Sequence, residues 1–420
     1  MPDLPILSAT TTNIHLPAWF DLMASLPPEA TVFTRGGEGM VGFGVAAVLT
    51  ASGPNRMSEL ADQWRQLCQQ TTQIDPTPGS GRGLVAFGSV AFAADSTQPS
   101  ILVVPKVTLG VRDGRAWLTS VAPSGEAPAT GLSEQWRTPN LSSTSDASPG
   151  PLRSGRVSSA EFVAAVEQAV AEIRSGDLGK VVLARDLMAE LPAGFDLRPV
   201  LQQLATKYPS CWTYQVGGQF GASPELLVRV SHSQVSARVL AGTAGRGTDP
   251  GVDRAIAAAL ASSHKNTQEH RFAVASLVNA LTPFCREISA DSEPFSLALP
   301  NVWHLASDVT GALREQASVL DLAQALHPTA AVAGTPTEAA LQAIARLEPF
   351  DRGGYAGPVG WIDSHGDGEW AIALRGGRVE GGLLRAFAGC GIVAESDPAA
   401  ELAETELKFQ PIRSALVALG

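Results

Sequence analysis

The sequence has few cysteines, no long apolar run and a shortage of basic residues. Its 420 residues include four cysteines, and 30 Lys and Arg stand against 41 Asp and Glu, which gives a formal net charge of −11. The cysteines are scattered, with no CxxC or Cys/His spacing, so neither a zinc site nor a disulfide framework is expected. Nucleic acids and anionic membranes attract a basic field, so the acidic balance argues against both partners.

Signals for export and membrane insertion are also missing. The first residues contain no basic segment followed by an apolar run, so we expect no signal peptide. Apolar stretches such as Val41–Leu49 are too short to cross a bilayer. With reduced thiols, this pattern predicts a cytoplasmic protein. The composition, 45% hydrophobic and 17% charged, is that of a folded chain.

The pattern of apolar residues divides the chain into three parts. Residues 1–121 read as short strands with one helix, residues 122–157 as a flexible connection rich in Pro, Ser and Gly, and residues 158–420 as the catalytic region. Ser158 and Glu161 predict a capping box, and Gly176 the end of that helix. One long helical run is expected from about Asp253 to Leu281. Hairpin-like strand pairs outnumber βαβ repeats, so we predict an α+β protein of mainly antiparallel sheets.

Two short motifs are interpreted as coincidences. Gly37–Gly42 matches GxGxxG, but strand-like residues follow it, whereas a dinucleotide site needs a helix there. Ser262–Lys265 has the SxxK spacing of a serine hydrolase, but we expect it in the middle of a helix and without the companion motifs.

A series of longer motifs carries a more specific signal. In chain order they are Lys180–Arg185 (KVVLAR), Gly221–Leu227 (GASPELL), Leu240–Gly245 (LAGTAG), Glu269-His270, His304-Leu305, Leu326–Thr329 (LHPT), Asp351–Trp361 (DRGGYAGPVGW), Ala373–Arg375 (ALR), Phe387–Val393 (FAGCGIV) and Ser396–Lys408 (SDPAAELAETELK). With these motifs the sequence resembles the chorismate-utilising enzymes, which include isochorismate, salicylate, anthranilate and aminodeoxychorismate synthases. The resemblance implies a single large α+β domain like that of anthranilate synthase component I. Residues 1–121 would belong to the same domain.

The resemblance also implies the chemistry. Conversion of chorismate to isochorismate adds water at one ring carbon and removes a hydroxyl from another, which requires a base, an acid and a cation. By resemblance Lys180 is the base and Glu225 the acid. Burial at the start of an apolar strand would lower the pKa of Lys180, and semi-burial would raise that of Glu225. An exposed strand-edge residue is the simpler alternative for each. Relatives that use ammonia do not usually carry Lys at this position.

Three carboxylates are the candidate ligands of a Mg²⁺ cofactor. Glu401 and Glu404 share one face of a helix with Lys408, and Glu269 would come from another helix. An oxygen-only set suits Mg²⁺, although a helix N-terminus and a pair with Lys265 also account for acids at 401 and 269. Family members usually carry an acid where this chain has Asn266, which we leave out of the ligand set.

Fixed hydrogen-bond donors are expected around the substrate carboxylates. The candidates are Arg375 as a bidentate fork, Tyr355, Lys408 and the backbone at Gly242, Thr243 and Gly389. Turns or bulges explain the glycines equally well. His304 and His327 are further candidates, for which a buried structural role is at least as good an explanation.

Several functions remain open at this point. The favoured one is isochorismate synthase, an isomerase serving menaquinone or siderophore biosynthesis. A salicylate synthase shares Lys180 and Glu225 and then eliminates pyruvate. Less favoured are an anthranilate-type synthase and a non-catalytic chorismate-binding protein. The small-molecule partner would be chorismate, and we expect a monomer without an obligate partner subunit.

Overall fold

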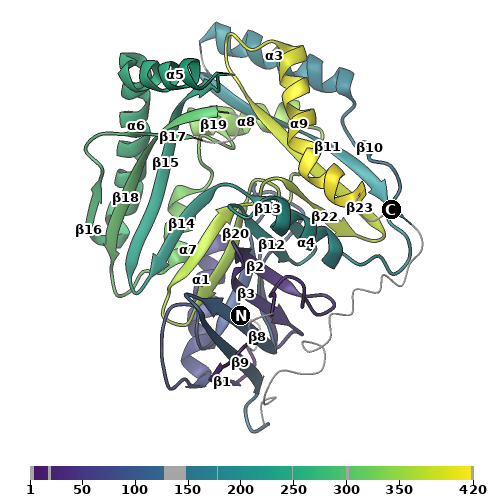
Figure 1. Cartoon of the computed structure of the whole chain (residues 1–420), viewed down its shortest axis with the longest axis vertical. Helices are drawn as coiled ribbons and strands as arrows, with labels where there is room; N and C mark the ends of the chain where they lie inside the picture. The colour runs from purple at the N-terminus through teal and green to yellow at the C-terminus, as the bar shows by residue number, and fades with distance from the viewer. Residues whose placement is uncertain are drawn as a thin grey trace. The chain divides into compact units, whose positions relative to one another are not determined.

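The computed structural model describes residues 4–17, 20–126, 148–176, 178–247, 249–298 and 302–417 (Figure 1). Within these ranges the side chains of Thr243, Lys265, Glu269 and Val302 are not described. Contacts between residues group the chain into two compact units. Unit 1 comprises residues 1–225, 327–364 and 371–420, and unit 2 comprises residues 226–326 and 365–370.

Unit 1 contains a 13-stranded, mainly antiparallel sheet. Its order is β10-β11-β23-β22-β13-β12-β2-β3-β8-β9-β1-β5, with β19 beside β11. The strands are β1 (Leu7–Ile14), β2 (Thr31–Arg35), β3 (Glu38–Phe43), β5 (Thr72–Ile74), β8 (Val107–Arg112), β9 (Arg115–Pro123), β10 (Arg153–Ser154), β11 (Lys180–Glu190), β12 (Trp212–Val216), β13 (Gln219–Ser223), β19 (Gly334–Thr335), β22 (Gly376–Glu380) and β23 (Leu383–Ile392). The pair β1–β5 is parallel.

Further strands and helices belong to the described part of this unit. Strands β4 (Ala47–Ala51), β7 (Ser100–Val104), β6 (Val85–Ser89) and β20 (Pro358–Asp363) pair in that order. The helices are α1 (Arg56–Gln70), α3 (Ser159–Ser175), α4 (Arg198–Lys207), α8 (Thr337–Leu347) and α9 (Pro398–Val417). Figure 1 shows α9 lying along β11 and β23 next to α3. The predicted capping box is present, since Ser158 and Glu161 exchange both hydrogen bonds, and Gly176 ends α3.

A buried apolar cluster holds α4 and α9 against the large sheet. Leu201 and Leu204 of α4 and Phe409 and Ile412 of α9 pack with sheet residues such as Phe220, and each is at most 2% exposed. Burial of this size is the main stabilising contribution in a domain. It fixes α9, which carries Glu401, Glu404 and Lys408, against β23.

Unit 2 is a smaller antiparallel sheet with helices. Its strands β16 (Cys285–Ala290), β18 (Val302–Leu313), β15 (Gln234–Gly245) and β14 (Leu226–Ser231) pair in that order, with β17 (Phe295–Ala298) beside β18. The helices are α5 (Pro250–Ser262), α6 (His264–Leu281), η1 (Thr282–Phe284) and α7 (Val319–Leu326). The chain re-enters this unit at the start of β21 (Gly368–Ile372).

Two local predictions were wrong. The expected continuous helix from Asp253 to Leu281 breaks at Ser263, whose backbone is extended and whose hydroxyl accepts from the N–H of Asn266. A serine that bonds the backbone of the next turn favours a helix start over a helix interior. The SxxK match at Ser262–Lys265 therefore lies at a junction between helices and not in the middle of one.

Other local expectations agree with the structure. The GxGxxG match runs into β3 and does not open a helix. The flexible connection was expected at residues 122–157. Strand β9 extends into its first residues and β10 lies near its last ones, while residues 127–147 lie outside the described part. The four cysteines form no disulfide. Within the described ranges, helices of membrane-spanning length and apolarity are absent.

Candidate active site

Lys180 is the first residue of β11, beside the glycine-rich strand β23. Its side chain is half-buried and passes across Gly391, where a Cβ would stand 2.8 Å from the Lys180 Cε. Any larger residue at 391 would therefore displace the lysine. Gly389 and Gly391 are two residues apart, so they share one face of β23.

Glu225 lies just after β13, and its carboxyl has three cationic neighbours. Burial raises the pKa of Glu225, and the positive charges of Arg375, Lys180 and Lys408 act in the opposite direction. The desolvation effect is the larger one, so the neutral acid is favoured. A carboxyl of raised pKa within a cationic cluster is suited to give a proton to a leaving oxygen and then to remain as a carboxylate.

Tyr355 is buried beside this cluster. Its ring stacks on Phe387 with centroids 5.1 Å apart, and its hydroxyl lies 3.2 Å from where a Cβ of Gly389 would stand. Burial raises the pKa of the phenol to about 12, so Tyr355 keeps its proton near neutral pH and acts as a neutral hydrogen-bond donor.

Lys408 joins the helix α9 to β23. Its Nζ donates to the Gly389 carbonyl at 2.7 Å and pairs with Glu404 at 2.6 Å. Arg375 stands just before β22 with a φ of 50°, and its carbonyl accepts from the N–H of Ala222. Lys408 and Arg375 are thus held by separate elements of unit 1, and both act on Glu225.

The two carboxylates expected on α9 differ in their surroundings. Glu401 Oε1 accepts from the Ser396 hydroxyl at 2.7 Å, while its Oε2 is buried without a hydrogen-bond partner. The side chain of Glu404 is 50% exposed. Within the part of the chain that the structure describes, no three His, Cys, Asp or Glu side chains form a metal-binding group. The buried, partnerless Glu401 Oε2 nevertheless fits a cation, as does the all-oxygen character of the set.

The remaining predicted residues lie in unit 2. Gly242, with a φ of 82°, sits at an irregularity in β15 where the register against β18 shifts between Leu240 and Thr243. The neighbouring carbonyls of Ala241 and Gly242 are bonded by His270 and His304 respectively. Burial lowers the pKa of both histidines, which supports the structural interpretation of His304.

Helix α6 packs on this part of β15. A Cβ at Gly242 would stand 3.3 Å from the Asn266 Cβ, and Glu269 follows one turn later on the same helix. The backbone at Gly242 and Thr243 and the ligand candidate Glu269 thus belong to adjacent elements of unit 2, which also contains His304. The other candidates belong to unit 1.

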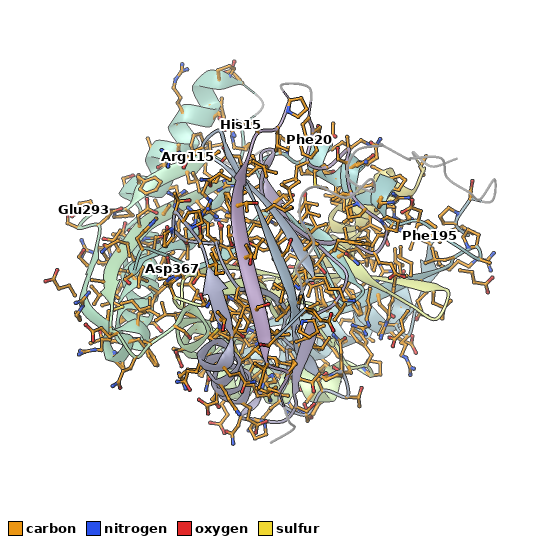
Figure 2. The ribbon with its side chains drawn as sticks, turned by 90° about the horizontal axis from the view of Figure 1, so that it is seen from below. His15, Phe20, Arg115, Phe195, Glu293 and Asp367 are labelled. Carbon is orange, nitrogen blue, oxygen red and sulfur yellow. The ribbon has the colours of Figure 1, made fainter. Side chains whose placement is uncertain are left out.

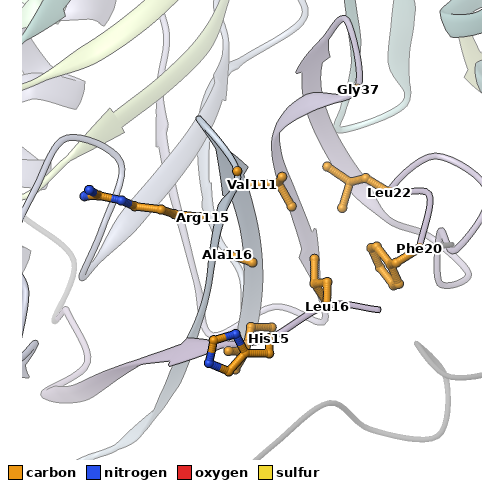
Figure 3. Close-up of a pocket in the computed structure, with 10 residues that line it drawn as sticks. His15, Leu16, Phe20, Leu22, Gly37, Val111, Arg115 and Ala116 are labelled. Carbon is orange, nitrogen blue, oxygen red and sulfur yellow. The ribbon is translucent and has the colours of Figure 1, made fainter. Parts of the chain in front are cut away.

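A cavity of about 210 Å³ lies elsewhere in unit 1. It is lined at one end of the N-terminal strands by residues that include Ile14, His15, Phe20 and Leu22, and it contains none of the predicted site residues. Figure 2 shows His15, Phe20 and Arg115 close together at this end. In Figure 3 the Arg115 side chain extends away from Phe20 and Leu22. Its lining combines apolar side chains with His15 and Arg115.

Sequence reasoning missed several residues that support the site. They are Gly391 under Lys180, Ser396 against Glu401, and the buried pair Glu348 and Arg352. The Gly-Cys-Gly spacing could have indicated Gly391, since alternate residues of a strand share a face. His327, by contrast, is a structural residue, because its Nε2 donates to the Phe92 carbonyl and burial lowers its pKa to about 4.

The arrangement in unit 1 places the cations Lys180, Arg375 and Lys408 around the acid Glu225, a composition suited to the class of enzymes that act on small anionic substrates. Comparison with known proteins names the class. Residues 3–417 match the family model of the chorismate binding enzymes, and the chain belongs to this family. The resemblance expected from the sequence motifs is therefore confirmed.

Three proteins illustrate the similarity of this chain to known sequences and structures. The chain is 33% identical over 402 residues to isochorismate synthase MenF of Bacillus subtilis, covering 90% of this chain and 85% of the relative. It is 41% identical over 263 residues to isochorismate synthase DhbC of the same organism, covering 60% and 66%. Anthranilate synthase component I of Streptococcus pneumoniae superposes with a TM-score of 0.69 at 23% identity, covering 91% and 92%. This likeness confirms the predicted α+β class of mainly antiparallel sheets flanked by helices.

Proposed function

We propose that the protein is an isochorismate synthase, an isomerase that converts chorismate to isochorismate. The observation that carries the proposal is the carboxyl of Glu225, whose pKa burial raises amid the charges of Arg375, Lys180 and Lys408. The isochorismate synthase relatives support the same reaction and the isomerase class.

In the proposed reaction, residues of unit 1 carry out the proton transfers. The Lys180 amine takes a proton from water, whose oxygen then bonds to a ring carbon. The carbon–oxygen bond to the ring hydroxyl breaks, and Glu225 protonates the departing oxygen, so one water enters and one leaves. Arg375, Tyr355 and Lys408, with the backbone at Gly389, hold the substrate carboxylates. Gly242 and Thr243 of unit 2 are proposed as further backbone contacts.

A magnesium ion fits the proposed reaction. Glu401 and Glu404 would hold it, and Glu269 is the proposed third ligand. The remaining coordination positions suit water and substrate oxygens. Bound there, the ion would supply positive charge to balance the ring carboxylate of the substrate. Asn266 stays outside the ligand set, because its side chain carries no negative charge; its backbone N–H donates to the Ser263 hydroxyl, and its Cβ faces Gly242.

Incubation of the protein with chorismate and Mg²⁺ at neutral pH, with product identification, tests the proposal. We expect isochorismate to accumulate. Release of pyruvate with fluorescent salicylate would instead identify a salicylate synthase, the second candidate, which has the same Lys180 and Glu225. Incorporation of ammonia would identify an anthranilate-type synthase. We propose that the product enters menaquinone or siderophore biosynthesis.

Replacement of the base gives the first prediction. Lys180→Ala should lower kcat by roughly 10²- to 10⁴-fold, the usual contribution of general acid–base catalysis, while chorismate binding measured by calorimetry is retained. Lys207→Ala is the matched control, because Lys207 is an exposed lysine in the last turn of α4. Undiminished turnover by the Lys180 variant would refute the assigned base.

A further inference from the structure

The edge of β11 opposite β23 has a short stretch without a neighbouring strand. On this edge β19 pairs with Lys180 and Val181, and β10 pairs only with Leu187 and Met188. Between them the backbone groups of Val182 and Ala184 point away from β23. Buried backbone groups need partners, since an unpaired one costs about as much as a lost hydrogen bond.

A buried ion pair supplies two of the missing partners. Glu348 Oε1 accepts from the Ala184 N–H at 2.7 Å, and Arg352 Nη2 donates to the Val182 carbonyl at 2.7 Å. The Val182 N–H donates to the Ala333 carbonyl at 2.8 Å. The two side chains are 3% and 2% exposed. Glu348 and Arg352 therefore replace a strand along this edge.

The same pair joins β11 to the turn that carries Tyr355. Arg352 Nη1 donates to the Val332 carbonyl at 2.9 Å, and the guanidinium lies 4.4 Å from the centre of the Phe92 ring. The backbone carbonyl of Arg352 accepts from the N–H of Tyr355 at 3.0 Å. Glu348 and Arg352 also act on the charge of the Tyr355 phenol.

We propose that Glu348 and Arg352 are positioning residues of the reaction, which fix the strand that begins with Lys180 against the turn that presents Tyr355. This inference rests on the proposed function. The hydrogen bonds and the ion pair of both side chains are made within the protein itself, so neither is assigned a contact with the substrate. The pair acts through the backbone at Val182 and Ala184, two and four residues beyond the proposed base, and small displacements of reacting groups are enough to lower a rate greatly.

The residue types fit this role better than a simple contribution to stability. A buried ion pair often stabilises a protein no more than apolar residues of similar volume do. Arginine is required here because its planar fork reaches Glu348, Val182 and Val332 at once, whereas lysine has a single ammonium. Arg352→Lys therefore keeps the positive charge but cannot form the hydrogen bonds of the guanidinium to all three residues at the same time.

The experiment compares Arg352→Lys with Arg82→Lys. Arg82 forms a bidentate pair with Asp75, 11% and 9% exposed, and also lies over an aromatic ring, Trp117, but it contacts none of the proposed site residues. We expect Arg352→Lys to lower kcat by on the order of 10²-fold with KM changed by less than about threefold. Arg82→Lys should leave both constants unchanged.

A second readout is independent of activity. Backbone hydrogen exchange at Val182 and Ala184 should be faster in Arg352→Lys than in the wild type, and unchanged in Arg82→Lys. Glu348→Gln keeps an acceptor for Ala184 but leaves the guanidinium without a counter-charge. Glu348→Gln should likewise lower kcat and leave KM nearly unchanged. This variant is used in place of Arg352→Lys if Arg352→Lys does not fold.

The outcomes separate the two proposals. An active wild type whose Arg352→Lys variant keeps its kcat and its exchange rates overturns the positioning role alone. Equal losses of kcat in the Arg352 and Arg82 variants also overturn it, because general destabilisation would then suffice. A wild type that makes no isochorismate overturns the proposed function, and the role of the pair in that reaction falls with it, whatever the exchange rates.

Discussion

At the scale of single residues, Glu225 shows how environment sets a role. The residue is one of 41 acids in the sequence, and its flanking apolar residues predict only partial burial. In the structure burial raises its pKa, against the effects of three cations that lie 45, 150 and 183 positions away along the chain (225 − 180, 375 − 225 and 408 − 225). The raised pKa of Glu225 therefore comes from the tertiary arrangement.

Replacement of this acid should lower activity and raise stability. Glu225→Gln is expected to lower kcat by roughly 10²- to 10⁴-fold. The folded pKa of Glu225 is above its unfolded value, so its ionisation favours the unfolded state at any pH above the unfolded value. The variant should therefore have a higher Tm than the wild type at pH 7, and the difference should vanish near pH 4.

Thermal unfolding from pH 4 to pH 8 with activity assays checks this prediction. Glu190→Gln provides the control, because Glu190 is an exposed acid at the end of β11. A wild type more stable than Glu225→Gln at pH 7 would contradict the raised pKa.

At the scale of elements, the start of α9 combines helix capping with the proposed metal site. The N–H of Val393, just after β23, donates to Ser396 Oγ, which in turn donates to Glu401 Oε1. Asp397 accepts from the N–H of Ala400, so it caps the helix independently of Ser396. Ser396 thus links the end of β23 to the orientation of one carboxylate.

Loss of this hydroxyl should weaken magnesium binding more than it weakens the fold. We expect Ser396→Ala to raise the Mg²⁺ concentration for half-maximal activity about tenfold, since groups that orient a metal ligand usually contribute this much or more. Calorimetric titration with Mg²⁺ should show the same shift. Ser158→Ala removes a capping hydroxyl from α3 and is the control, with a stability loss of about 1 kcal/mol and unchanged Mg²⁺ dependence. An unchanged Mg²⁺ titration in Ser396→Ala would remove Ser396 from this role.

At the scale of the whole molecule, acid stability should depend on a buried histidine. The folded pKa of His327 is about 4, against an ordinary value of 6.5. Between these values the unfolded chain binds a proton that the folded protein does not, so stability falls as pH decreases from 6.5 to 4. His327→Gln keeps a donor for the Phe92 carbonyl and lacks this titration, so its Tm should fall less steeply over that range.

His264→Gln serves as the reference, because His264 is an exposed residue at the start of α6. Parallel Tm curves for the wild type and His327→Gln between pH 6.5 and 4 would show that His327 does not contribute to acid unfolding.

The sequence by itself determined the class of protein and most of its local structure. The capping box of α3, the strand that starts at Lys180 and the antiparallel α+β class follow from patterns within a few residues, because helix capping and strand alternation are local effects. The ordered motifs were enough to identify the family. The helix break at Ser263 was missed, because a serine between two helical patterns gives only a weak local signal.

Only the tertiary structure decided how these residues act. Glu348 reaches the N–H of Ala184 across 164 positions of the chain, and Arg352 reaches the Val182 carbonyl across 170. Sheet pairing and burial bring such groups together. Neither produces a pattern in the sequence that links residues so many positions apart. The order of motifs predicted an enzyme with Lys180 as its base. The packing of β11, β22, β23 and α9 brought the charges of Lys180, Arg375 and Lys408 near one half-buried acid, Glu225, since only folding removes water from its carboxyl.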